Sequence, residues 1–148
     1  MSNRLYGVAA ITSHPADKVT MIKPFGTWAR SPARVRDNTL KKIKERFPTI
    51  EGWSDHQVFV ERIDQKLVDR FRVEQRWYDK TGARSLYLAV LGAVKEKDGE
   101  KESDIMLTSF LSQCSAMAED KARALGNERF PKSLGWEVVA FKLISLKL

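Results

Sequence analysis

The sequence has one cysteine and two histidines among its 148 residues, and it has no apolar run long enough to span a bilayer. A single cysteine, Cys114, excludes an internal disulfide and supplies no zinc cluster. We therefore expect a cytoplasmic protein with no metal and no other cofactor. The apolar stretch near the N-terminus is too short for a secretory signal, and we expect no membrane partner.

Motifs for catalysis are also missing. His14 precedes Pro15 in a predicted turn, and His56 lies beside Asp55 on a predicted strand, where adjacent side chains point to opposite faces. A nucleophilic triad needs side chains that converge from separate elements. The sequence contains neither GxGxxG nor GxxxxGK[ST], the glycine loops that hold nucleotide phosphates. We therefore expect that the protein is not an enzyme.

The composition is that of an ordinary globular protein, with 43% hydrophobic and 30% charged residues. A chain of this length buries a sizeable core, so we expect one folded domain over residues 1–148. The net charge is +7, and residues 1–74 carry 14 Lys and Arg against 9 acids. A basic balance favours contact with nucleic acid, anionic lipid or an acidic protein.

One short motif occurs twice, as RFPTIEGW at 46–53 and as RFPKSLGW at 129–136. Upstream of the two copies, LYGVAAI begins at Leu5 and LYLAVLGAV begins at Leu86, which are 81 positions apart, whereas the motifs are 83 apart. Two inserted residues reconcile the copies. The pattern predicts internal pseudo-repeats over about 4–64 and 85–148.

In both copies the motif joins the end of a predicted helix to the start of a predicted strand. Its Phe closes the last helical turn, its Pro ends the helix and its Gly permits the chain reversal. Its Trp anchors the strand, and its Arg lies at the negative end of the helix dipole. We interpret the motif as a structural joint made of Arg46, Phe47, Pro48, Gly52 and Trp53, and of Arg129, Phe130, Pro131, Gly135 and Trp136. The alternative is that the two tryptophans stack on a ligand.

The periodicity predicts an α+β fold with an antiparallel, strongly curved sheet of about seven strands and two helices on one face. The first helix follows the N-cap Ser31, begins at Pro32 and ends at Pro48. The second begins near Ser112. Apolar residues at helical spacing predict the buried faces, which are Ala33, Leu40, Ile43 and Phe47 in the first helix and Leu111, Cys114, Ala118, Ala122 and Leu125 in the second.

A strand is predicted over about 66–78, between the two pseudo-repeats. Phe71, Val73 and Trp77 alternate there with arginines, and DKTG at 79–82 predicts a hairpin turn. With this strand, the order of elements after residue 56 resembles the ββββα plan of some single-strand nucleic-acid-binding proteins, although no motif residue carries the resemblance.

Function is sought on the basic surface that remains. Arginines on a sheet or helix can grip phosphates and stack on bases, although charged side chains also serve simply to face water. Our hypothesis is a non-catalytic binding protein for a polyanion, above all single-stranded DNA or RNA, that uses Arg30, Arg34, Lys41, Lys42, Arg62, Arg70, Arg72 and Arg76. The alternative is an assembly component, such as a homodimer, with Leu146 and Leu148 exposed.

Overall fold

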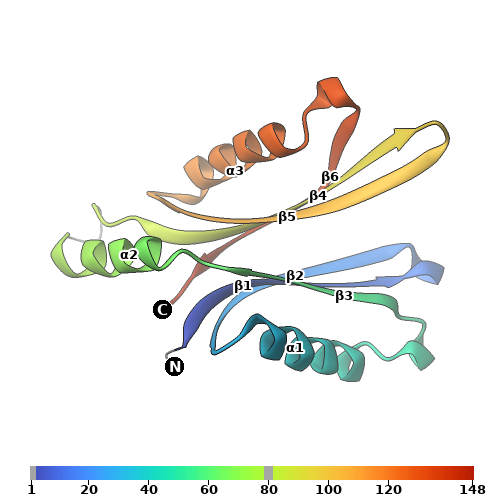
Figure 1. Ribbon diagram of the computed structural model, residues 1–148, viewed down its shortest axis with the longest axis horizontal. Helices are drawn as coiled ribbons and strands as arrows, with labels where there is room; N and C mark the ends of the chain where they lie inside the picture. Colours follow the sequence, from blue (N-terminus) through green and yellow to red (C-terminus); the bar gives the residue numbers. More distant parts are fainter. Residues whose placement is uncertain (1–2, 79–81) are drawn as a thin grey trace. The chain divides into compact units, whose positions relative to one another are not determined.

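The computed structural model describes residues 3–78 and 82–148 of the protein, in which six strands and three helices are present (Figure 1). The chain divides into two compact units, residues 1–63 and 64–148, each with its own three-stranded antiparallel sheet. The α+β class and the antiparallel pairing were predicted correctly. The single sheet of seven strands with two helices was wrong. One domain over residues 1–148 stays a prediction.

The first unit contains β1 (Arg4–His14), β2 (Val19–Ala29), α1 (Pro32–Arg46) and β3 (Ser54–Arg62). β1 is the central strand and pairs antiparallel with both neighbours, in the order β2-β1-β3. β1 and β2 form a hairpin. Helix α1 then runs along one face of this sheet and carries the chain from β2 to β3 (Figure 1).

Helix α1 begins where the sequence predicted, because the Ser31 hydroxyl accepts a hydrogen bond of 3.3 Å from the Arg34 backbone N–H. Its buried face is formed by Val35, Thr39 and Ile43, four residues apart. The predicted face was partly wrong, since Ala33 is exposed. The error came from treating threonine as a surface residue, which hid the i, i+4, i+8 series that Thr39 completes.

The second unit contains α2 (Gln65–Trp77), β4 (Ser85–Lys97), β5 (Glu100–Ser112), α3 (Ser115–Arg129) and β6 (Trp136–Leu146). Its sheet has the order β5-β4-β6, with β4 in the centre. Asp and Gly at positions 98 and 99 both have positive φ and form the tight β4–β5 turn. Helix α3 covers one face of this sheet and leads to β6 (Figure 1).

The strand predicted over 66–78 is the helix α2 instead. The Asp64 carboxylate caps it by accepting a hydrogen bond of 3.0 Å from the Lys66 N–H, and Val68 is fully buried. Helix formers such as Gln, Lys, Leu, Arg and Glu fill the segment, and this preference outweighs the short alternation that suggested a strand. No strand therefore precedes DKTG, and residues 79–81 of that turn lie outside the described residues.

Helix α3 buries small residues against its sheet. Ala118, Ala122 and Gly126 are buried, and they pack on a core that includes Leu91 of β4. Cys114 was predicted to lie in this core and does not. It occupies the N-cap position of α3 with an extended backbone, and its side chain is exposed.

The two copies of the RFPxxxGW motif have the same geometry. The Phe47 N–H donates to the Ile43 carbonyl at 2.7 Å and ends α1. A 3-10 turn follows, and Gly52 then adopts a φ of 96°, which favours glycine. In the second copy the Phe130 N–H bonds to a helix carbonyl at the same distance, and Gly135 has a φ of 91°.

A candidate ligand-binding groove

The predicted basic residues lie on different elements and do not form one cluster. Arg30 follows β2, while Arg34, Lys41 and Lys42 belong to α1. Arg62 ends β3. The remaining three, Arg70, Arg72 and Arg76, lie on α2 in the second unit rather than on a strand face.

A groove in the first unit brings three of these residues together. It lies between α1 and β2, has a volume of about 640 Å³, and is lined by Arg30, Arg34 and Lys42 but not by Lys41 or Arg62. Ligand pockets commonly have volumes of about 300 to 1,000 Å³, so the groove is large enough for a small molecule or part of a larger one. We call it the basic groove.

The rim of the basic groove is cationic. Lys23 of β2 and Arg46 of α1 join the three predicted residues there, and no Asp or Glu lines the groove. Within residues 3–78 and 82–148, none of these five cations forms an ion pair with a carboxylate. Five like charges around one hollow attract an anionic ligand. Sequence reasoning missed Lys23, because a single lysine on a predicted strand does not indicate that its side chain faces the helix.

The walls of the groove are largely apolar. Met21 and Phe25 come from β2, Ala10 comes from β1, and Val35 and Ile43 come from α1. The odd-numbered residues of β2 and the even-numbered residues of β1 share the sheet face that α1 covers, since Val8 pairs with Phe25 in the register. A ligand in the groove would therefore contact apolar surface below and cations above.

The two helices lie differently on their sheets, and in the second unit a hollow of about 380 Å³ lies between α3 and β6. α1 packs mainly against β3, whereas α3 packs mainly against β5, the strand that matches β2 in the other sheet. The motif spacing matches Ile43 with Gly126, and the strand spacing matches Ala10 with Leu91. A Cβ at Gly126 would lie 2.5 Å from Leu91 Cδ2, so glycine is what permits this close approach.

An ion pair joins α3 to β5 in the second unit. Arg129 of α3 donates to the Asp104 carboxylate of β5 at 3.2 Å. The matching pair in the first unit is Arg46 and Met21, because Asp104 pairs with Ala93 and Met21 pairs with Thr12 in equivalent registers. Methionine offers no charge, and Arg46 has its guanidinium carbon 5.9 Å from the Phe47 ring centroid.

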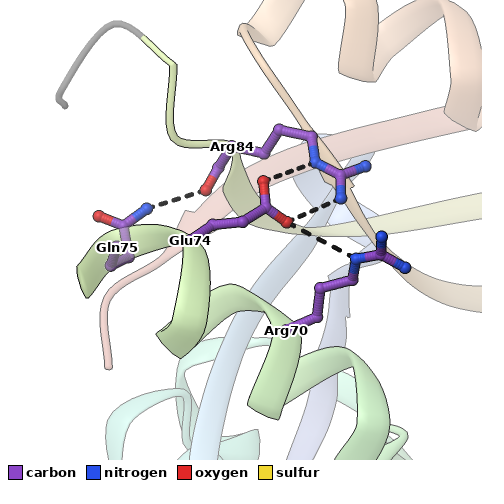
Figure 2. A network of polar contacts seen from close by, with 4 residues as sticks. All are labelled: Arg70, Glu74, Gln75 and Arg84. Carbon is purple, nitrogen blue, oxygen red and sulfur yellow. Dashed lines mark hydrogen bonds and ion pairs between the residues drawn. The ribbon is translucent and has the colours of Figure 1, made fainter. Parts of the chain in front are cut away.

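The second unit has its own polar cluster near α2, shown in Figure 2. Arg84 donates two hydrogen bonds to the buried Glu74 carboxylate, at 2.8 and 2.7 Å, and Gln75 donates to the Arg84 carbonyl at 2.9 Å. Arg70 lies 4.0 Å from the same carboxylate. These bonds hold the pKa of Glu74 below its ordinary value, with hydrogen bonding from Arg84 as the main cause, although burial acts in the opposite direction. Arg70 is therefore part of a structural network.

The other two α2 arginines line a more polar hollow. Arg72 and Arg76 lie around a space of about 530 Å³, together with Lys147 and the hydroxyls of Ser85 and Ser145. Its lining is more polar than that of the basic groove, so it offers a ligand less apolar contact.

The two motif tryptophans are packed against protein on the sides that the structure shows. The Trp53 ring meets the Phe47 ring edge-on at 4.8 Å and the His14 ring at 5.1 Å. Trp136 lies 5.2 Å from the Phe130 ring, with the Lys95 ammonium 5.7 Å from its ring centroid. These contacts favour the structural interpretation of the motif over ligand stacking.

Among the described residues, no group of His, Cys, Asp and Glu side chains could hold a metal ion. Within the same part of the chain, no helix has the length and apolar character needed to cross a membrane. Comparisons of the chain with known protein families, with curated proteins and with solved structures give no match. The function proposed for the basic groove therefore depends on the residues that line it.

Proposed function

We propose that the protein is a non-catalytic binding protein whose first unit binds single-stranded nucleic acid in the basic groove. The observation that carries the proposal is the set of five cations without carboxylate partners around an apolar hollow. Phosphates neutralise such cations and release counterions, which supplies affinity without sequence preference.

The apolar walls favour a single strand over a duplex. In a duplex the bases are stacked inside the helix, whereas an unpaired base can leave the stack and bury its flat face. Phe25 and Ile43 offer surface for such a base, while Arg34 and Lys42 lie on the rim of the same groove. A base in the groove with its neighbouring phosphates on the rim uses both features.

The test is a fluorescence anisotropy titration of a labelled single-stranded oligonucleotide across a salt series. Each phosphate contact contributes about 0.7 to the slope of log affinity against log salt for single strands, so full use of the rim gives a slope near −3.5. No binding at low salt to any single-stranded oligonucleotide would end the proposal.

Lys41 and Lys42 form a matched pair for this test. They are neighbours on α1 and both are exposed, but only Lys42 lines the groove. We expect Lys42→Ala to weaken binding and to reduce the salt slope by about 0.7, and Lys41→Ala to leave both nearly unchanged. Equal effects of the two substitutions would show that the helix surface, and not the groove, binds the strand.

The alternative of an assembly component depended on two exposed leucines near the C-terminus. Leu146 is buried, while Leu148 is 45% exposed. One of the two predicted contact residues is therefore not available at the surface.

We also infer that the units are pseudo-repeats that diverged, as the sequence suggested for about 4–64 and 85–148. The same element order, strand–strand–helix–strand, and the same sheet order support this inference. The inferred divergence placed the hollow beside β2 in the first unit and beside β6 in the second.

A further inference from the structure

Two buried threonines line the basic groove, one from the sheet and one from the helix, and we call them its floor. Thr12 comes from β1 and Thr39 from α1, and they are only 3% and 8% exposed. A hydroxyl that lines a hollow can hydrogen-bond to a ligand there if the protein leaves it a donor or acceptor, so the partners of these two hydroxyls decide what they can offer.

The hydrogen bonds of these two hydroxyls are incomplete. Within the described residues, Thr39 has no hydrogen-bond partner for its side chain. The Thr12 hydroxyl lies 2.6 Å from His56 Nδ1 and 3.3 Å from the Ser54 carbonyl oxygen. When Thr12 donates to Ser54, His56 must donate from Nδ1, and the hydroxyl keeps a lone pair for a further donor.

His56 lies behind Thr12 on β3 and is itself only partly satisfied. Its Nε2 atom is buried and has no hydrogen-bond partner in the described part of the chain. Asp55, just before it, has a φ of 55° at a point where the register between β1 and β3 shifts. This irregularity is where the chain turns the imidazole to the Thr12 hydroxyl.

The second unit lacks all three polar side chains. The strand spacing of 81 matches Thr12 with Ala93, and the motif spacing of 83 matches Thr39 with Ala122. Val139 takes the place of His56, because Gln57 and Ala140 occupy the same register position in the two sheets. At these positions, polar side chains therefore occur in the first unit, which has the basic groove, and apolar ones in the second.

We infer that the floor of the basic groove recognises the edge of one unpaired base, with Thr39 and the Thr12–His56 pair as its hydrogen-bonding groups. The inference depends on the proposed function and names the part of the nucleic acid that enters the groove. A base has flat apolar faces for the walls formed by Phe25 and Ile43, and it carries donors and acceptors on its edge for the floor. An alkyl anion would leave the floor hydroxyls unpaired and is therefore disfavoured.

The experiment compares five single strands of equal length, the four homopolymers and an abasic strand with the same backbone charge. We expect the affinities of the wild-type protein for the homopolymers to span at least tenfold, with the abasic strand the weakest. Thr39→Val keeps the shape and removes the hydroxyl, and we expect it to bring the four homopolymers within about twofold of one another at an unchanged salt slope.

Two further variants and one melting experiment separate recognition from folding. Thr39→Ser restores a hydroxyl and should restore the differences among the bases. Thr20→Val removes a hydroxyl from β2 outside the groove and should change nothing. Thr39→Val should melt at about the same temperature as the wild type, because it keeps the shape of the side chain and removes a hydroxyl that bonds no protein group among the described residues.

The outcomes distinguish this inference from the proposed function. Equal affinity of the wild-type protein for all five strands, or full discrimination by Thr39→Val, would overturn base recognition and leave a groove that binds phosphates alone. Failure of every strand to bind at low salt would overturn both proposals. Direct binding of an acidic peptide, with no binding of oligonucleotides, would do the same.

Discussion

The two units share one topology and differ in where the helix lies on the sheet. In the first unit α1 packs mainly against β3 and leaves a groove beside β2, whereas in the second unit α3 packs mainly against β5 and leaves a smaller hollow beside β6. The residues at the closest approach differ in size, with Ile43 and Ala10 in one unit and Gly126 and Leu91 in the other. The comparison teaches that the position of the helix on the sheet decides where the hollow lies, without any new element of structure.

The largest effect is expected when the second unit receives the helix residue of the first. Gly126→Ile should destabilise the protein by about 3 kcal/mol, because the larger side chain has no room beside the buried Leu91. Urea denaturation measures the change. Adding Leu91→Ala should recover at least about 1 kcal/mol, since the pair then matches Ile43 and Ala10. Simple additivity of the two substitutions would show that this contact does not set the helix position.

A smaller effect is expected from breaking the ion pair between Glu74 and Arg84 in the second unit. The pKa of Glu74 is lowered in the folded protein, so its contribution to stability is present at neutral pH and is lost as the pH falls through the ordinary carboxyl range. We expect Glu74→Gln to destabilise the protein by about 2 kcal/mol at pH 7 and to change its stability much less at acidic pH. Thermal melts from pH 7 to pH 3 measure this. A constant difference across the range would contradict it.

A substitution in the basic groove of the first unit should weaken ligand binding. Met21→Asp places a carboxylate where Asp104 stands in the second unit, within the groove and near Arg46. We expect about a tenfold loss of affinity for single-stranded oligonucleotides, or about 1.4 kcal/mol, from the new repulsion and the occupied arginine. Met117→Asp, on the exposed surface of α3, is the control with the same change of charge. Equal losses from both would mean that net charge alone governs binding.

The smallest effect is expected from breaking the ion pair between Asp104 and Arg129 in the second unit. Asp104→Asn should lower the free energy of unfolding by only about 0.5 kcal/mol, because Asp104 and Arg129 are 43% and 55% exposed. It should not create oligonucleotide binding in the second unit, since the contact of Gly126 with Leu91 still holds α3 against β5. A loss above about 2 kcal/mol would mean that the ion pair, and not the packing, holds the helix.

Local chemistry in the sequence determined where several elements begin and end. Ser31 and Pro32 start α1, and the Phe–Pro pair at residues 47 and 48 ends it. The turn between β4 and β5 follows from Asp98 and Gly99, which tolerate positive φ. Each of these features depends on a few neighbouring residues, so a single sequence was enough to predict where α1 begins and ends.

The tertiary structure alone decided the site. Lys41 and Lys42 are the same residue type side by side, and only the packing of α1 places one of them on the groove. Thr39 resembles a surface residue in the sequence, but it is buried beside the groove because α1 turns that side chain toward the sheet. The position of a helix on its sheet depends on the volumes of side chains that are distant in sequence, such as Ile43 and Ala10. The periodicity of one segment does not show how closely that segment packs against another.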